Sequence, residues 1–80
     1  MKSAVAFGKV LRQLREAAEL TQEQLGFEAG LRRTYISILE LGQQQPSLTT
    51  IIKLAEALNC TPGKLIDLAY AEINNSREIN

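Results

Sequence analysis

The chain has 80 residues, of which 45% are hydrophobic, and its nine lysines and arginines balance nine aspartates and glutamates. This length suits one small domain, and no apolar run is long enough to span a bilayer. One cysteine and no histidine exclude an intrachain disulfide and a Cys/His zinc site, and remove the commonest general base. We therefore expect a cytoplasmic chain that is not an enzyme and that has no cofactor, metal ion or membrane as partner.

The first apolar stripe predicts a helix over residues 4–18. Charged side chains within it, among them Lys9 and Arg12, argue against a signal peptide in this stretch. The apolar side chains recur at intervals of three and four residues, the spacing of one buried helix face: Phe7, Val10, Leu11, Leu14 and Ala18.

The stretch TQEQLGFEAGLRRTYISILELG, residues 21–42, predicts two short helices joined by a tight turn. Thr21 is a good N-cap, and Gln24 three residues later completes a capping box. Gly30 ends the first of these helices at residue 29, because so sharp a turn needs a residue that tolerates positive φ. The second helix then runs over residues 32–41 and stops at Gly42.

The outer face of this second helix carries side chains that a core does not need. The inward positions of the two helices are apolar: Leu25, Ala29, Leu31, Ile36 and Leu39. The outward positions of the second helix are Arg33, Thr34, Ser37, Ile38 and Leu41. A helix held out in this way has the width to enter the DNA major groove, about 12 Å across. An ordinary solvated helix face is the alternative interpretation.

The rest of the chain predicts two more helices and no strand. Ser47, behind Pro46, is an N-cap for a helix that ends near residue 58. Thr61 and Pro62 start a last helix from residue 63 to about residue 74, and the polar residues 75–80 are expected to form a frayed tail. The last helix carries more apolar surface than a small body can hide, so we predict a homodimer contact there: Leu65, Leu68, Ala69 and Ile73, flanked by Ile66 and Tyr70.

Residues 21–42 resemble the helix-turn-helix of the Cro/CI-type, or Xre-like, regulators of bacteria and phages, and the resemblance covers roughly residues 7–68. Within that family, the run LRRTYIS at residues 31–37 is most similar to the controller proteins of restriction–modification systems. The resemblance implies an all-α, compact five-helix bundle of the lambda-repressor-like DNA-binding type over residues 1–74. It also implies an ion pair between Arg15 and Glu40 that locks the first helix onto the third. Two solvated surface charges are the alternative.

Position on the helices and the resemblance together give a set of expected contacts with double-stranded DNA. Arg33 and Thr34 stand at the end of the helix that enters the groove deepest, and arginine can form two hydrogen bonds to guanine. The resemblance implies a phosphate contact for Gln22, although an ordinary polar residue of the first turn would look the same. The full set of expected DNA contacts is Gln22, Arg32, Arg33, Thr34, Tyr35, Ser37, Ile38 and Gln43.

Two functions fit these observations. The first is a sequence-specific transcription regulator that acts as a homodimer on a palindromic operator. Glutamines occupy positions 43–45, where the family commonly carries basic residues, which predicts weak monomeric binding and a shallow dependence on salt. The second is a protein-interaction module with a partner protein, such as an antitoxin or an accessory subunit. Zero net charge and three apolar side chains at outward positions favour it: Phe27, Ile38 and Leu41.

Overall fold

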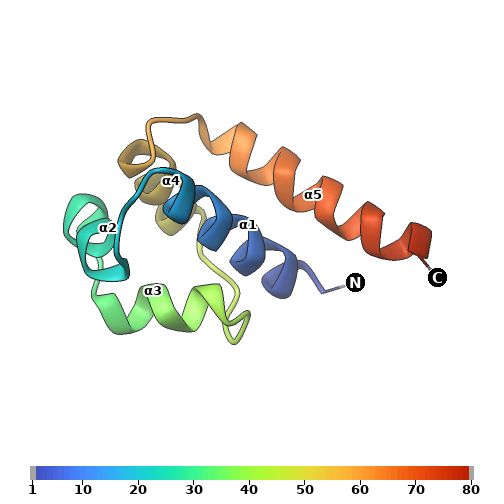
Figure 1. Cartoon of the computed structure of the whole chain (residues 1–80), viewed down its shortest axis with the longest axis horizontal. Coiled ribbons are helices and arrows are strands. Elements are labelled where there is room, and N and C mark those ends of the chain that lie inside the picture. The colour runs from blue at the N-terminus through green and yellow to red at the C-terminus, as the bar shows by residue number, and fades with distance from the viewer. Residues whose placement is uncertain (1, 80) are drawn as a thin grey trace.

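The structure is a computed structural model that describes the backbone of residues 2–79 and the side chains of residues 2–75. Its helices in chain order are α1 (Ser3–Ala17), α2 (Gln22–Ala29), α3 (Arg33–Glu40), α4 (Leu48–Ala57) and α5 (Pro62–Ile79). α1 packs against α5 and α3, and α4 packs against α2 and α5 (Figure 1). Over the described residues the fold is the predicted all-α one. None of these helices combines the length and the apolar character that crossing a bilayer demands.

Side chains from all of the helices meet in one core. Phe7 and Val10 of α1 are part of it, each 3% exposed. Burying a large apolar side chain contributes roughly 1.5–3 kcal/mol. Of the stripe predicted over residues 4–18, Leu14 is half-buried and Ala18, just past α1, is exposed. The largest fully buried side chains are Leu11, Leu25, Ile36, Leu39, Leu54 and Leu65.

The ends of α2 follow the predicted local chemistry. The amide of Gln24 donates to Thr21 Oγ1 at 3.0 Å, and the amide of Thr21 donates to Gln24 Oε1 at 2.8 Å. This capping box satisfies backbone donors that the first turn leaves unpaired. At the other end Gly30 adopts φ 69° and ψ 33°, the left-handed conformation that turns the chain toward α3.

Two glycines allow α3 to lie directly against its neighbours. A Cβ on Gly8 of α1 would meet the carbonyl oxygen of Leu39 and would stand 2.8 Å from that of Glu40. A Cβ on Gly26 of α2 would stand 2.6 Å from the carbonyl oxygen of Leu31. Both distances are shorter than van der Waals contact, so a larger residue at either position would push α3 away.

α5 differs from the sequence prediction at its C-terminal end. It continues through Ile79, so residues 75–79 extend the helix rather than forming a separate tail. The polar run from Asn75 contains no glycine or proline that would end a helix. The side chains of residues 76–80 lie outside the described part of the structure.

Two of the four residues of the predicted dimer contact on α5 are buried within this chain. Leu65 is 0% exposed and Ala69 is 8% exposed, because α5 lies along α1 and uses this stripe to complete the core of its own chain. Leu68 and Ile73 are half-buried. Among the side chains of α5 that the structure describes, the large apolar ones left in solvent are the flanking Ile66, at 48% exposure, and Tyr70, at 61%.

Candidate nucleic-acid interface

The outward face of α3 begins with two exposed side chains. Arg33 and Thr34 are both exposed, whereas Ile36 and Leu39 on the opposite face are fully buried. One turn further along, Ser37 and Ile38 are half-buried. The N-terminal end of α3 is therefore accessible to another molecule at Arg33 and Thr34. Ile38 is less accessible than its predicted outward position implies.

Arg15 of α1 and Glu40 of α3 form a two-point ion pair. Arg15 Nε lies 2.6 Å from Glu40 Oε2, and Arg15 Nη2 lies 3.0 Å from Glu40 Oε1. The hydrogen bonds to Glu40, more than the nearby charge, raise the pKa of the Arg15 guanidinium above its ordinary value, and burial opposes that rise. The pair that the resemblance implies is present, and it fixes the C-terminal end of α3 to α1.

Gln22 belongs to the same cluster. Its Nε2 donates to Glu40 Oε1 at 3.0 Å, and Arg15 Nη1 donates to the carbonyl of Leu20 at 2.7 Å. The buried carboxylate of Glu40 at the end of α3 thus accepts hydrogen bonds from α1 and from the first turn of α2, while Arg15 also holds the turn after α1. The amide of Gln22, expected at a DNA phosphate, is engaged inside the protein, and the glutamine is half-buried.

A shallow groove of about 410 Å³ opens beside this cluster, and it is lined by Arg15, Thr21, Gln22, Glu23 and Arg33. Arg33 contributes the positive charge of the α3 face to this lining. Thr21, Gln22 and Glu23 contribute the capped start of α2, with its partial positive charge. The combination of a guanidinium and a helix N-terminus is suited to an anionic oxygen such as that of a phosphate.

Tyr35 is turned toward α4 more than toward solvent. It is half-buried and packs against the core, and its phenol oxygen lies 3.4 Å from Thr50 Oγ1. Thr50 is itself 7% exposed and receives a hydrogen bond from Ser47 Oγ at 3.0 Å. This chain of hydroxyls joins α3 to the start of α4, so Tyr35 has a structural contact in addition to its expected contact with a DNA backbone.

Arg32 and Gln43 flank α3 at its two ends. Arg32 is the residue just before the helix, with φ −73° and ψ 146°, and its side chain is exposed. The side chain of Gln43 is exposed too. Its backbone N–H donates to the carbonyl of Ile38 at 3.1 Å, which closes the end of α3. Neither side chain forms a hydrogen bond or ion pair within the described part of the structure, and the two residues stand at opposite ends of α3.

Sequence reasoning missed two features of this site. The hydrogen bond from Gln22 to Glu40 has no local signal, because the partners are eighteen positions apart. The close approach of α1 and α3 at Gly8 did have one: a glycine inside an apolar helical stripe marks a point where another backbone comes near.

Comparison with known proteins agrees with this geometry. A family model described as helix-turn-helix matches residues 11–65. Control protein C.BamHI from Bacillus amyloliquefaciens is 44% identical over 73 residues, which cover 90% of this chain and 88% of that protein. Control protein C.SmaI from Serratia marcescens is 43% identical over 56 residues, covering 70% and 67%.

A solved structure gives the same result. The restriction–modification controller protein C.AhdI from Aeromonas hydrophila superposes with a TM-score of 0.78 at 46% identity, covering 81% of this chain and 98% of that one. The resemblance that residues 21–42 suggested is confirmed. The chain belongs to the helix-turn-helix family of DNA-binding regulators, in its Xre-like branch, and is similar there to the controller proteins of restriction–modification systems.

Proposed function

We propose that the protein is a sequence-specific transcription regulator that inserts α3 into the DNA major groove. The observation that carries this proposal is the exposure of Arg33 and Thr34 on a helix whose opposite face is fully buried. In helix-turn-helix proteins the N-terminal residues of the second helix contact base edges. The relatives that match most of this chain are named control or controller proteins, and this supports the same role.

Within this proposal the contacts divide into two groups. Arg33, Thr34 and Ser37 face base edges, and Arg33 hydrogen-bonds a guanine. Contacts to the sugar–phosphate backbone position the helix without reading sequence. Ile38, half-buried, packs its exposed edge against a thymine methyl. The backbone contacts are Gln22, Arg32, Tyr35 and Gln43.

Few cations are available for the phosphates. Lys9, Arg12 and Arg15 are committed to ion pairs with carboxylates of the same chain. Arg32 and Arg33 are exposed beside α3, whereas glutamines follow it. Because each neutralised phosphate adds roughly 0.9 to the slope of log affinity against log salt, this interface gives a shallow slope. Affinity then depends on two copies binding together.

We further propose that the homodimer forms through the exposed apolar side chains of α5, in place of the buried stripe. Ile66 and Tyr70 are one helical turn apart on its outer surface. A symmetric dimer presents two α3 helices about one DNA turn apart, roughly 34–36 Å. The operator is then a palindrome with half-sites at that spacing.

The experiment is a selection of binding sites from random duplex DNA at low and moderate salt. The expected result is a palindrome that Arg33→Ala no longer enriches. Lys64→Ala is the matched control, because Lys64 is also an exposed cation but stands on α5. No enrichment at either salt, or equal loss with both variants, contradicts the proposal.

A protein-interaction module is the second candidate function, and the exposure of Phe27 at 85% favours it. The selection separates the two functions, because a module without DNA specificity enriches no sequence. A regulator that also binds a partner protein through Phe27 still enriches a DNA sequence.

A further inference from the structure

Phe27 is the most exposed large hydrophobic side chain among those described, at 85%. It lies on the outer surface of α2 and takes no part in the core of the bundle. Glu23 precedes it by one helical turn and Glu28 follows it directly, and both are exposed. An aromatic ring in water contributes nothing to folding, although a buried aromatic dominates the energetics of many protein interfaces.

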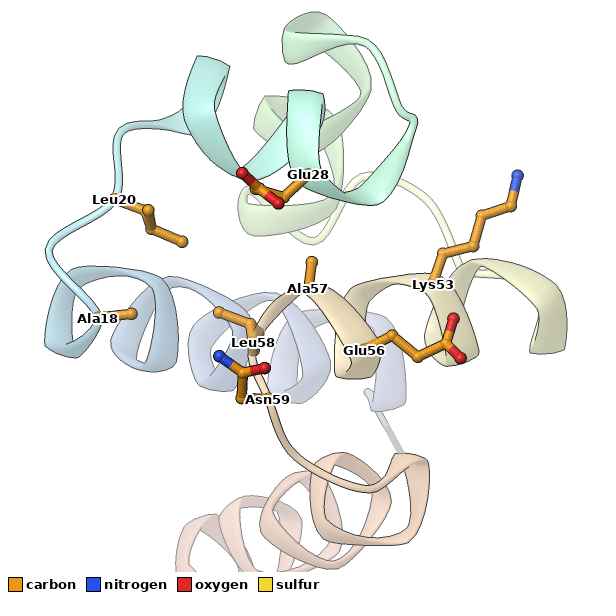
Figure 2. Close-up of a pocket in the computed structure, with 8 residues that line it drawn as sticks. All are labelled: Ala18, Leu20, Glu28, Lys53, Glu56, Ala57, Leu58 and Asn59. Atoms are coloured by element: carbon orange, nitrogen blue, oxygen red, sulfur yellow. The ribbon is translucent and has the colours of Figure 1, made fainter.

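A groove of about 480 Å³ lies beside this surface, between α2, the turn after α1 and the end of α4 (Figure 2). Apolar side chains form part of its lining: Ala18, Leu20, Ala57 and Leu58. Figure 2 shows Glu28 at the edge of α2 that faces Leu20 and Ala57, while Lys53 and Glu56 point away from α4. The groove therefore places a few apolar side chains within a lining that is polar and charged over most of its surface.

The charges of this region select the kind of molecule that fits. Glu28 and Glu56 line the groove and form no ion pair among the described side chains, and Lys53 is the one cation in its lining. DNA is disfavoured at this groove because its phosphates would face these two carboxylates. A second copy of the chain would bring the same excess of carboxylates against this one, so self-association is disfavoured as well.

We propose that Phe27 and this groove form a docking surface for a basic, amphipathic segment of a partner protein. Phe27 packs among apolar side chains of that segment, and the groove receives another. Lysines or arginines of the segment pair with Glu28 and Glu56 at the rim. None of these residues belongs to the outward face of α3, so the partner and DNA can be bound at the same time.

The test is a selection of peptides from a random display library against the full chain. Enriched peptides are expected to combine lysine or arginine with apolar residues. Phe27→Ser and Glu28→Lys should each weaken their binding roughly tenfold or more, as for an anchor residue at an interface. Leu48→Ser and Asp67→Lys are the matched controls, because they make the same kind of change at exposed positions elsewhere.

Three results overturn the proposal: no enrichment, an acidic or uncharged consensus, or binding that the two control variants weaken as much as Phe27→Ser and Glu28→Lys. A titration followed by NMR gives an independent measurement, in which the amide signals of Leu20, Ala57 and Leu58 should shift on peptide binding. DNA affinity of Phe27→Ser is measured in parallel and should stay unchanged. Peptide binding without DNA binding would refute the proposed function and leave the docking surface in place.

Discussion

Arg15 and Glu40 stand twenty-five positions apart in the sequence and are joined by two hydrogen bonds, of 2.6 and 3.0 Å. Their side chains are 12% and 4% exposed. The guanidinium and the carboxylate match in shape and charge, and the pair connects the first helix of the bundle with the end of α3.

Removing one partner of this pair should destabilise the protein more than removing both. Arg15→Met leaves the Glu40 carboxylate buried without its cation, which costs about 3 kcal/mol or more. The double variant Arg15→Met with Glu40→Leu should recover most of that loss. Urea unfolding of the two singles and the double measures the coupling, and additive losses would contradict the buried pair.

The same pair should keep its contribution across the usual pH range. Its hydrogen bonds raise the pKa of Arg15 above the value of the unfolded chain. A cation with a raised pKa stabilises the fold at every pH below its unfolded pKa and loses that contribution only as pH rises through the folded value. The difference in unfolding free energy between wild type and Arg15→Met should therefore stay constant from neutral pH up to about pH 10. That range lies well below the ordinary pKa of arginine.

Gly8→Ala should destabilise the fold although alanine is the better helix former. The new Cβ would collide with the carbonyl oxygens of Leu39 and Glu40, and overpacking of this kind costs about 1–3 kcal/mol. Gly63→Ala is the matched control inside α5, where the nearest atom to a new Cβ is 3.9 Å away. It should gain up to about 1 kcal/mol from helix propensity. Thermal unfolding compares the two, and equal shifts in Tm would argue against the close approach.

Glu19→Gly should stabilise the protein. Glu19 follows α1 with φ 60°, a left-handed conformation that costs a residue with a Cβ roughly 1 kcal/mol and costs glycine little. Ala18→Gly is the control, because Ala18 has φ −84° and gains no relief. Chemical denaturation should separate the two variants in opposite directions.

Gln22→Ala separates a structural role of the glutamine from a DNA contact. Loss of its hydrogen bond to Glu40 should cost about 1 kcal/mol of stability. If the amide also contacts a phosphate, affinity for every DNA sequence should fall by a similar factor, with the selected site unchanged. Affinity measured on specific and random duplexes tests this. A change in the preferred sequence would mean that Gln22 reads a base or alters the pose of α3.

The helices could be predicted because an apolar stripe, a cap or a turn glycine marks each of them, although α1 and α3 begin without a side-chain cap. Thr21 with Gln24, Ser47 and Gly30 mark starts and stops by their side-chain or backbone chemistry. The apolar stripes then identified the buried faces. These signals act over one or two helical turns, which is the range that a sequence pattern can express.

The surfaces were predicted less well because they depend on how the helices are arranged. The stripe of Leu65 and Ala69 has the spacing of an interface, yet only the packing of α5 on α1 decides whether it meets its own chain or another. The engagement of Gln22 by Glu40 likewise depends on three segments meeting. Amphipathicity alone does not say which neighbour covers a face.

The face of α3 that carries Arg33 and Thr34 makes no contribution to the buried core. Substitutions there should be nearly free of folding penalties, whereas those at Ile36 or Leu39 should not. Under the proposed function, descendants of this chain can therefore acquire new operators by altering a handful of codons while the scaffold is inherited intact. Such a division lets regulators that share one scaffold diverge in sequence preference, so that they do not interfere with one another.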